Sequence, residues 1–458
     1  LNLNATGIYA SNSAAGSGLY VRTGGVVNMN APDISGVGNS GGLDWILVND
    51  NLPGTSVINM SAGSSITTPR LDLGSNASLD RVGNVLGTGV MTVTTTLNLY
   101  SGTISAGLSG AAPINKQFTT DVTLSGNNSG LTGAGTWYIQ QGGGLILDYS
   151  TDNNSKVSPN GLLDMRVGRL LLTGNASAPT TQTINGLTLV NAAGPNLISV
   201  AAGAGQTISL NLGNVTRASN AQDGTIRFVL PAGGVSASNG ILTTTVNNLA
   251  TASGILGGWA TVDTGTGLFF AANSVSGGSG NLTAGLTAFA DDVSTWQPQT
   301  NVSDLVGYSG TVSRFAVNSV RFGAGTGSTL SVQSGGVLAV TGGGVLSTPS
   351  VTTGTPRIAG GSIVSGLIAS GVPELVFTAE GTQTLEIASG IGLNQAIVKS
   401  GAGTVLLSGR NTSTGNVDVY QGTLQAGGGN AIGDLSLVTM LTTGSSTFQL
   451  VGNETIGR

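Results

Sequence analysis

Residues Val398–Gly429, VKSGAGTVLLSGRNTSTGNVDVYQGTLQAGGG, show the pattern that predicts the fold of the whole chain. Short runs of alternating apolar and polar residues occur at Thr404–Ser408, Val417–Tyr420 and Thr423–Gln425. Glycine, serine, asparagine or threonine bounds each run, a pattern typical of β-strands joined by tight turns. Glycine reaches positive φ without steric cost, so the glycines between the runs are predicted corner residues. Similar short motifs recur along most of the sequence, and this recurrence predicts a fold built from repeated structural units.

The order of residues in this stretch also resembles a known family. Gly401-Ala-Gly-Thr-Val-Leu-Leu-Ser-Gly409 is followed by Asn411-Thr412, Thr414-Gly415 and Gly422-Thr-Leu424. This order resembles the autotransporter-associated β-strand repeat, also called the passenger-associated transport repeat. Val405, Ser413 and Asn416 replace the usual Leu, Tyr and Gly of that repeat but keep strand and turn character. A shorter, partial match to the same order of residues occurs at Val122–Gly126, followed by Asn127-Asn128.

The resemblance implies a β-helical passenger that is secreted or displayed at the surface of a Gram-negative-type bacterium. The repeat is structural, so the resemblance implies no catalytic residue, cofactor or metal ligand. Extracellular or cell-surface localisation is therefore an expectation from the resemblance.

Composition limits the possible classes of protein. Glycine supplies 76 of 458 residues without a Gly-X-Y period, which excludes a collagen triple helix. Charged residues make up 8% and hydrophobic residues 39%, and this combination argues against disorder, which needs many charges and little to bury. The chain must therefore pack, with a surface rich in serine, threonine, asparagine and glycine. Such a surface has little charge repulsion and favours self-association.

Charge, cysteine content and hydrophobic run length exclude further classes. The formal net charge is −5 and the arginines and lysines form no cluster, so no nucleic acid partner is predicted. Cysteine is absent, which excludes disulfides and thiolate metal sites and is compatible with export. No run approaches the ~20 apolar residues of a membrane helix, so no membrane insertion is predicted for this segment.

The spacing of the repeated phrases predicts the architecture. Similar phrases begin at Gly168 and Gly186, 18 residues apart, and at Gly403 and Gly422, 19 residues apart. A period near 20 with one to three short strands per turn suits an all-β, parallel β-helix (β-solenoid) with loop insertions. The general preference for right-handed parallel crossovers predicts a right-handed helix. Repeated Leu-Asn-Leu and Ile-Asn-Met triplets predict asparagine side chains stacked coil over coil.

Variation in the pattern predicts the domain organisation. We predict a β-solenoid over residues 1–253, with loop excursions near 33–54 and 148–159. Residues 254–309 concentrate the aromatic residues and are predicted to form an irregular insertion or junction with one helical turn. A second solenoid stretch is predicted over 310–458, containing the family repeat at 398–429.

The two ends of the sequence suggest contacts with other chains. Leu1–Asn4 has a strand pattern, and Phe448–Arg458 stops within a repeat without an amphipathic helix or charged strand. Terminal coils of a solenoid expose unpaired backbone groups that natural proteins usually protect. We expect either that the chain is part of a longer one or that its ends meet other subunits, giving an oligomer or filament.

Candidate catalytic groups are few. Histidine is absent, which removes Ser-His-Asp and Cys-His mechanisms. Parallel β-helix lyases and glycosidases use carboxylate clusters, and this chain has three acidic groupings: Asp33/Asp44/Asp50, Asp291-Asp292 with Asp304, and Glu374/Glu380/Glu386. We expect these to be solvated loop or turn carboxylates. No catalytic, cofactor-binding or metal-ligating residue is predicted.

Two further patterns are given structural interpretations. Gly323–Gly327 resembles a phosphate-binding loop, but no lysine follows it and no helix is predicted there. Trp259, Phe269, Phe270 and Trp296 are either a sugar-stacking platform or the packing of an insertion, and packing is favoured.

Three functions remain open from sequence. The favoured one is a non-enzymatic extracellular β-helical stalk or filament subunit that self-associates through its solenoid ends. The second is an adhesin or autotransporter passenger whose loops bind a surface glycan or a host or matrix ligand. The third is a β-helix carbohydrate-active enzyme.

Overall fold

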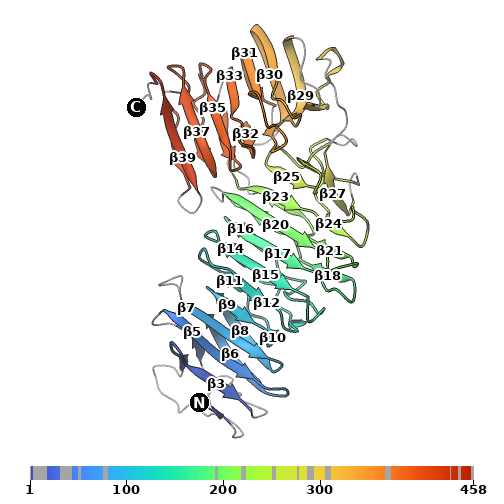
Figure 1. Cartoon of the computed structure of the whole chain (residues 1–458), viewed down its shortest axis with the longest axis vertical. Coiled ribbons are helices and arrows are strands. Elements are labelled where there is room, and N and C mark those ends of the chain that lie inside the picture. The colour runs from blue at the N-terminus through green and yellow to red at the C-terminus, as the bar shows by residue number, and fades with distance from the viewer. Residues whose placement is uncertain are drawn as a thin grey trace. The chain divides into compact units, whose positions relative to one another are not determined.

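The computed structural model describes residues 2–3, 18–30, 44–49, 53–75, 81–190, 194–217, 223–249, 254–275, 278–285, 293–304, 311–366, 373–392, 394–433, 435–441 and 445–454. Among these residues the regular elements are β-strands, apart from one 3-10 turn, η1 (Val293–Thr295) (Figure 1). The chain forms two compact units. The first comprises Leu1–Thr188, Leu197–Thr216 and Pro231–Leu242, and the second comprises Leu189–Asn196, Arg217–Leu230 and Thr243–Arg458.

The first unit is built from stacked coils whose strands form separate sheets (Figure 1). One sheet, called here the first sheet, contains in spatial order β1 (Asn2–Leu3), β3 (Val26–Met29), β5 (Gly54–Met60), β7 (Arg81–Gly87), β9 (Gly102–Ile104), β12 (Val122–Leu124), β15 (Gly144–Asp148), β17 (Arg169–Thr173) and β20 (Pro195–Ala201). The second sheet contains β2 (Gly18–Val21), β4 (Trp45–Val48), β6 (Ser65–Leu73), β8 (Val90–Leu99), β11 (Ile114–Lys116), β14 (Trp137–Gln140), β16 (Leu163–Arg166), β19 (Leu187–Leu189) and β22 (Val215–Arg217). Shorter strands complete the coils: β10 (Gly107–Gly110), β13 (Gly130–Leu131), β18 (Thr180–Thr183), β21 (Ile208–Asn211) and β24 (Gly240–Thr243).

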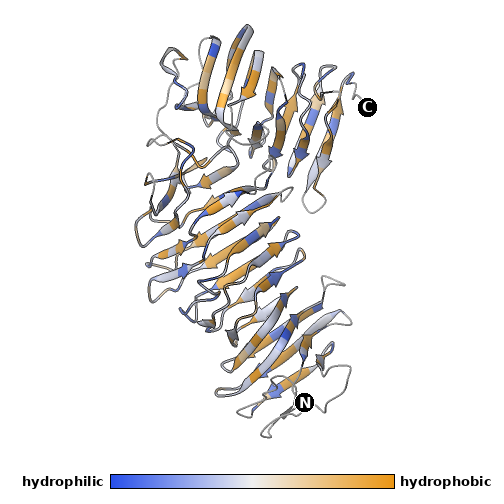
Figure 2. Ribbon diagram, turned by 180° about the vertical axis from the view of Figure 1, so that it is seen from behind, coloured by the Kyte–Doolittle hydropathy of each residue, from blue (hydrophilic) through white to orange (hydrophobic). Residues whose placement is uncertain are grey.

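Inward side chains of the first sheet form one continuous apolar ladder. Neighbouring strands pair in parallel and in register, so the same position of each coil lies above the previous one. The members are at most 5% exposed and are, in order, Val27, Ile58, Val85, Ile104, Leu124, Leu147, Leu172 and Val200. Burying each such side chain contributes about 1.5–3 kcal/mol, so these ladders are the main source of stability. Bands of apolar residues recur on successive strands in Figure 2.

The second unit repeats this design around a branched parallel sheet. The branched sheet contains β28 (Asn301–Asp304), β29 (Thr311–Phe322), β30 (Thr329–Ser347), β31 (Arg357–Ser365), β32 (Glu374–Ala379), β33 (Leu385–Ile391), β34 (Ala396–Ser400), β35 (Thr404–Leu407), β36 (Val417–Val419), β37 (Gly422–Gly427), β38 (Val438–Met440) and β39 (Ser446–Val451). Four further strands of the unit lie outside this sheet: β23 (Thr225–Val229), β25 (Ala260–Asp263), β26 (Leu268–Asn273) and β27 (Gly280–Ala284). The long strand β30 pairs with β31 through one part and with β32 through another. Two rows of strands therefore diverge from it, one leading to β38 and the other to β39.

A second set of ladders fills the core of this unit. One runs through Leu330, Ile358, Ile387, Leu407 and Ala426, which are fully buried, and ends at Leu450, which is 50% exposed. The other runs through Val302, Val320, Val345, Phe377, Lys399 and Val419, which are fully buried, and ends at Met440, which is 44% exposed. Antiparallel pairing occurs between β25 and β26 and between β26 and β27, within the stretch predicted to be an irregular insertion.

The glycines of the opening stretch have two different structural reasons. Gly401 and Gly422 have φ angles of 80° and 71°, as predicted for corner residues. Gly403, Gly409 and Gly415 do not have positive φ, so the corner explanation is wrong for them. A Cβ atom on Gly409 would lie 2.2 Å from the Ser389 carbonyl oxygen, and one on Gly415 would lie 2.0 Å from that of Gln395. These glycines therefore allow one turn to rest directly on the backbone of the turn in the preceding coil.

The structure confirms the predicted fold class, an all-β parallel β-helix. The three strands predicted in the opening stretch correspond to β35, β36 and β37. The predicted stacking of asparagines is also confirmed, since Asn59 Nδ2 donates to Asn28 Oδ1 at 2.8 Å across two coils.

Candidate binding surface

The outer face of the second sheet carries an unusual concentration of polar and aromatic side chains. Successive residues of a strand point to opposite faces. The residues that alternate with the inward ladder of this sheet are therefore on its outer side, where Tyr20, Leu47, Asp72, Asn98, Asn115, Tyr138 and Asp164 are consecutive register partners. We call the surface formed by these residues and by their neighbours Arg22, Trp45, Arg70, Gln140 and Arg166 the ladder face.

A hydrogen-bonded row of side chains crosses the ladder face. Asn98 Nδ2 donates to Asp72 Oδ1 at 2.7 Å, Asn115 Nδ2 donates to Asn98 Oδ1 at 3.1 Å, and Gln140 Nε2 donates to Asn115 Oδ1 at 3.2 Å. Each bond joins neighbouring strands of the sheet, from β6 to β14. The row therefore fixes the side-chain orientations of four successive coils relative to one another.

Two arginine–aspartate pairs lie along this row. Arg70 Nη2 donates to Asp72 Oδ2 at 2.6 Å, and Arg166 Nη2 donates to Asp164 Oδ2 at 2.9 Å. The side chains of Arg70 and Arg166 are 50% and 45% exposed, whereas those of Asp72 and Asp164 are 5% and 9% exposed. The guanidinium groups therefore face solvent, and the carboxylates lie beneath them.

Aromatic rings lie close to these arginines. The rings of Tyr20 and Trp45 meet edge to face with 6.2 Å between their centroids, and Tyr20 is 46% exposed. A Cβ atom on Gly18 would lie 1.9 Å from Trp45 Nε1, so the glycine leaves the space in which the indole extends over β2. The guanidinium of Arg166 lies 5.1 Å from the ring centroid of Tyr138, a cation–π distance.

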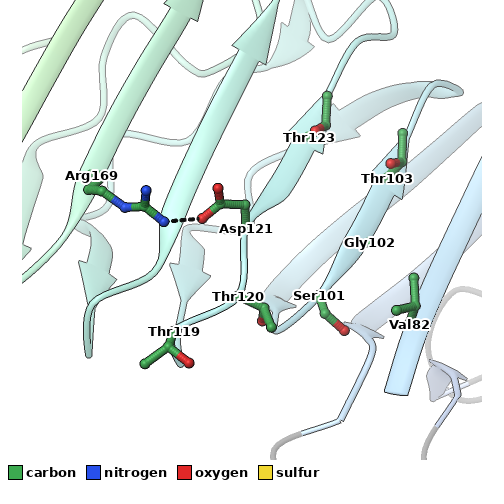
Figure 3. A pocket seen from close by; sticks show the side chains of 9 residues that line it. All are labelled: Val82, Ser101, Gly102, Thr103, Thr119, Thr120, Asp121, Thr123 and Arg169. Carbon is green, nitrogen blue, oxygen red and sulfur yellow. Dashed lines mark hydrogen bonds and ion pairs between the residues drawn. The ribbon is translucent and has the colours of Figure 1, made fainter. Parts of the chain in front are cut away.

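A hollow on the first sheet has a different character (Figure 3). Its lining is mostly hydroxyl-bearing: Val82, Ser101, Gly102, Thr103, Thr119, Thr120, Asp121, Thr123 and Arg169. Arg169 Nη2 lies 2.6 Å from Asp121 Oδ1, and the two side chains are similarly exposed, at 41% and 36%. Because its charges cancel at the surface and no aromatic ring lines it, this hollow lacks the features that distinguish the ladder face.

All three lysines of the chain are buried. Lys116, Lys156 and Lys399 each have no exposed surface. Lys399 occupies an inward ladder position between Phe377 and Val419, and its Nζ donates to the carbonyl oxygens of Ser400, Gly401 and Gln421 at 2.6–2.8 Å. Burial lowers the pKa of Lys399 to about 7. The ammonium group therefore ties the following turn and the next coil together from inside.

Lys116 plays the same part in the first unit. It lies in the inward ladder between Leu99 and Ile139, and its Nζ donates to the carbonyl oxygens of Gln117 and Phe118. Burial lowers its pKa to about 8. Lys116 precedes Val122-Thr-Leu124-Ser-Gly126 by the same number of residues as Lys399 precedes Val405-Leu-Leu407-Ser-Gly409. The segment Val122–Gly126 therefore has the same position relative to a buried lysine as Val405–Gly409.

A buried asparagine follows each of these two segments, and its side chain connects its own coil to the coils on both sides. Asn411 Oδ1 accepts from the Ile391 amide at 2.7 Å, and its Nδ2 donates to the Ala431 carbonyl. Asn128 Oδ1 accepts from the Leu108 amide at 2.9 Å, and its Nδ2 donates to the Lys156 carbonyl at 3.1 Å. These side chains replace backbone partners where the strands end.

Buried side chains hold the predicted loop near residues 148–159 against the neighbouring coils. No strand occurs between Asp148, the end of β15, and Leu163, the start of β16. Lys156 Nζ lies within 3.1 Å of the Ser125 and Gly126 carbonyl oxygens and 3.0 Å from Asp152 Oδ1, and burial lowers its pKa. Tyr149 Oη donates to Gln182 Oε1 at 2.6 Å. Two buried side chains therefore hold the loop against neighbouring coils.

Burial of every lysine has a direct chemical test. We expect an amine-reactive acylating reagent to leave all three lysines of the folded chain unmodified, because no solvent reaches their Nζ atoms. The α-amino group serves as the internal positive control, and all three lysines should react once the chain is unfolded in urea. Mass spectrometry after proteolysis measures both states. Rapid acylation of Lys116 or Lys399 in the folded chain would contradict this burial.

The acidic residues grouped in the sequence analysis differ in exposure and in ion-pair partners. The expectation of a solvated carboxylate is wrong for Glu374, which is 4% exposed on β32 and lies 2.7 Å from Arg217 Nη1. Glu380 and Glu386 have separate arginine partners, Arg227 and Arg357. Asp44 is exposed, whereas Asp33, Asp50, Asp291, Asp292 and the side chain of Asp304 lie outside the described residues.

Packing, the favoured interpretation of the four aromatic residues, agrees with the burial of two of them. Phe270 and Trp296 are 2% and 1% exposed and lie in apolar clusters, so neither can stack on a sugar. Trp259 lies beneath the Arg217 guanidinium, and Phe269 beneath that of Arg321. Gly323–Gly327 lies between β29 and β30, and no helix follows it in the described residues.

Two further features are absent from the described residues. No group of three or more aspartate or glutamate side chains there is placed to hold a metal ion. No helix in the same residues has the length and apolar character needed to cross a membrane.

The fold and the ladder face define a parallel β-helix protein with an arginine- and aromatic-bearing outer surface. No protein-family model matches the chain. The chain is similar to the adhesin BmaC autotransporter of Brucella suis biovar 1 (strain 1330), with 30% identity over 301 residues. The match covers 62% of this chain and 8% of that protein. This similarity relates the chain to autotransporter proteins and indicates a bacterial cell-surface or extracellular protein.

Sequence reasoning missed the ladder face and the buried lysines. Arg70-Leu-Asp72 and Asp164-Met-Arg166 both place opposite charges two residues apart on a strand, a spacing that puts them on one face. Lys399 follows Ile397-Val398, and a charged residue that continues an apolar run is the signal for an internal lysine.

Proposed function

We propose that the chain is a β-helical passenger segment of a bacterial surface adhesin, in which stacked coils hold a ligand-binding outer surface in fixed geometry. The observation that carries this proposal is the similarity to an autotransporter adhesin over 301 residues, together with the parallel ladders that stack coil upon coil. In-register stacking fixes the backbone positions from which the outward side chains project. A repeating scaffold is therefore suited to presenting an extended binding surface.

An adhesion assay tests this function. Beads coated with the folded chain should attach to immobilised host-cell surfaces and extracellular-matrix preparations. The control is a Leu124→Asp variant, whose buried charge in the inner ladder should unfold the first unit. Equal attachment of both bead types, or attachment no greater than that of uncoated beads, would reject the adhesin role.

A stalk role is compatible with the same scaffold, and self-association into a filament stays a prediction. Sedimentation of the purified chain over a wide concentration range tests it, and a constant sedimentation coefficient would reject it. We also propose that residues 398–429 are a copy of the autotransporter-associated β-strand repeat. Support comes from the shared placement of Lys399 and Lys116 before equivalent strands.

The domain division predicted from sequence is likewise proposed, with residues 254–309 as a junction between 1–253 and 310–458. Limited proteolysis that releases stable fragments ending in 254–309 would support it. We propose no catalytic activity. Release of sugar from a polysaccharide panel, lost on Asp291→Ala or Asp292→Ala, would instead favour a carbohydrate-active enzyme.

A further inference from the structure

We propose that the ladder face binds an acidic polysaccharide, a sugar chain bearing carboxylate or sulfate groups that lies across the strands of the second sheet. This inference rests on the adhesin function proposed above and names the chemical class of its ligand. It follows from the charge, the spacing and the side-chain chemistry of the ladder face.

In both ion pairs of this face the guanidinium group is the more exposed member. The guanidinium groups of Arg70 and Arg166 are about half exposed, whereas their aspartate partners are nearly buried. Arg22, which follows β2, is exposed as well, and its guanidinium lies 5.9 Å from the Tyr20 ring centroid. The carboxylates fix the guanidinium planes from below, leaving outward N–H groups for an anion. This arrangement favours an anionic ligand although the chain as a whole carries a net charge of −5.

The spacing of these arginines requires an extended ligand. Arg22 follows β2, Arg70 lies on β6 and Arg166 lies on β16, and the sheet order is β2-β4-β6-β8-β11-β14-β16. Across the sheet, with strands ~4.8 Å apart, Arg22 and Arg70 are separated by about 10 Å and Arg70 and Arg166 by about 19 Å. Arg70 lies on one side of the row that joins Tyr20 to Asp164, and Arg22 and Arg166 lie on the other side, about 13 Å further along the strands. A small anion can meet one of these groups, whereas a linear polymer can meet all three.

The remaining side chains favour sugar rings between the anionic groups. Tyr20 is 46% exposed and Trp45 and Tyr138 are partly exposed, so their rings offer aromatic surface on which the C–H faces of pyranose rings can stack. Asn115 and Gln140 are partly exposed and offer amide groups to sugar hydroxyls. The hydrogen bonds along the row hold these amides in place before a ligand arrives, which reduces the entropy lost on binding.

Binding to immobilised polymers tests the proposal. The folded chain is passed over heparin, polygalacturonate, neutral dextran and polyglutamate, and binding is measured by biolayer interferometry at several salt concentrations. We expect binding to heparin, polygalacturonate or both, weakening as salt rises, with little binding to dextran. Heparin and polygalacturonate distinguish a sulfated from a carboxylated ligand.

Variants test the location of the site. An Arg70→Gln/Arg166→Gln double variant should bind at least about tenfold more weakly, a loss of about 1.4 kcal/mol. The matched control is Arg169→Gln, which removes a similarly exposed arginine from the hollow of the first sheet and should leave binding unchanged. Circular dichroism and thermal unfolding establish that both variants keep the fold.

Three outcomes would overturn the proposal: no binding to either acidic polysaccharide, equal binding by the double variant, or equal binding to dextran. Polyglutamate binding as tight as that of the polysaccharides would assign the face to an acidic peptide instead. The adhesion assay separates this inference from the adhesin function. Beads carrying the double variant that still attach to host surfaces would reject the polysaccharide site and leave the adhesin function standing.

Discussion

The free energy of unfolding should rise between pH 7 and pH 10, because the buried lysines lose their protons at a much lower pH in the folded chain than in the unfolded chain. Burial lowers the pKa of Lys399 from 10.5 to about 7 and that of Lys116 from 10.5 to about 8. A lowered pKa in the folded state gives a stability contribution that is complete above the unfolded pKa and is lost as pH falls towards the folded pKa. At about 1.4 kcal/mol per pH unit, the gain by pH 10 is about 4 kcal/mol for the unit with Lys399 and about 3 kcal/mol for the unit with Lys116.

The rise should end near pH 10 because buried tyrosines act in the opposite direction. Burial raises the pKa of Tyr149 and Tyr420 above the ordinary value of 10.0. A raised pKa gives a contribution that is complete below the unfolded pKa and is lost as pH increases above it. The stability of the chain should therefore be maximal near pH 10 and not near neutrality.

Urea unfolding followed by circular dichroism at a series of pH values measures this curve. The Lys399→Met variant should lose the alkaline rise in the second unit and keep it in the first. Lys116→Met should only reduce the rise in the first unit, because burial also lowers the pKa of Lys156 there, and should leave the rise of the second unit unchanged. This pattern does not depend on whether either substitution stabilises the chain at pH 7. If the urea midpoint of the wild-type chain stayed constant or fell between pH 7 and pH 10, burial would not lower the pKa of Lys116 and Lys399.

The second large effect is expected on removing the asparagines that bridge three coils. Asn411→Ala leaves the Ile391 amide and the Ala431 carbonyl without their side-chain partner in a buried site. Each buried unsatisfied polar group costs about 1–3 kcal/mol, so the loss of both contacts should destabilise the second unit by about 2–6 kcal/mol. Asn128→Ala should have a similar effect on the first unit, where the Leu108 amide and the Lys156 carbonyl lose the same contacts.

The matched control is Asn394→Ala, which removes an exposed asparagine whose Oδ1 accepts from Thr414 at 3.2 Å. Surface changes of this kind usually alter stability by less than about 0.5 kcal/mol. Urea unfolding of the three variants at one pH makes the comparison. If Asn411→Ala and Asn394→Ala had equal effects, the bridging asparagine would have no special structural role.

Much of the fold could be predicted because the stacked ladders impose a local pattern on the sequence. Alternation in Thr404–Ser408 reports directly which side chains of β35 point inward. The strand predicted over Val417–Tyr420 is found as β36, but all of these residues are buried, including Asp418. The role of Gly409 and Gly415 could not be predicted, because the atoms that exclude a Cβ belong to Ser389 and Gln395 of the preceding coil. Such contacts depend on register between coils, which one sequence does not specify.

The candidate binding surface was harder to predict for the same reason. Arg70, Asn98, Asn115 and Arg166 lie far apart in sequence, and only the pairing of β6, β8, β11, β14 and β16 brings them onto one face. The buried position of Glu374 likewise depends on Arg217, which is 157 residues away. Composition alone suggested solvated carboxylates, because it carries no information about which charges meet.

Each strand of these ladders finds its partner only a coil away along the chain, as with Leu124 and Leu147 or Leu407 and Ala426. Folding therefore requires no meeting of distant chain segments to begin, and a nucleus of a few coils can grow by adding one more at its edge. A polypeptide that emerges gradually from a narrow opening could fold progressively as it appears. The absence of cysteine means that no covalent cross-link has to form or break on the way.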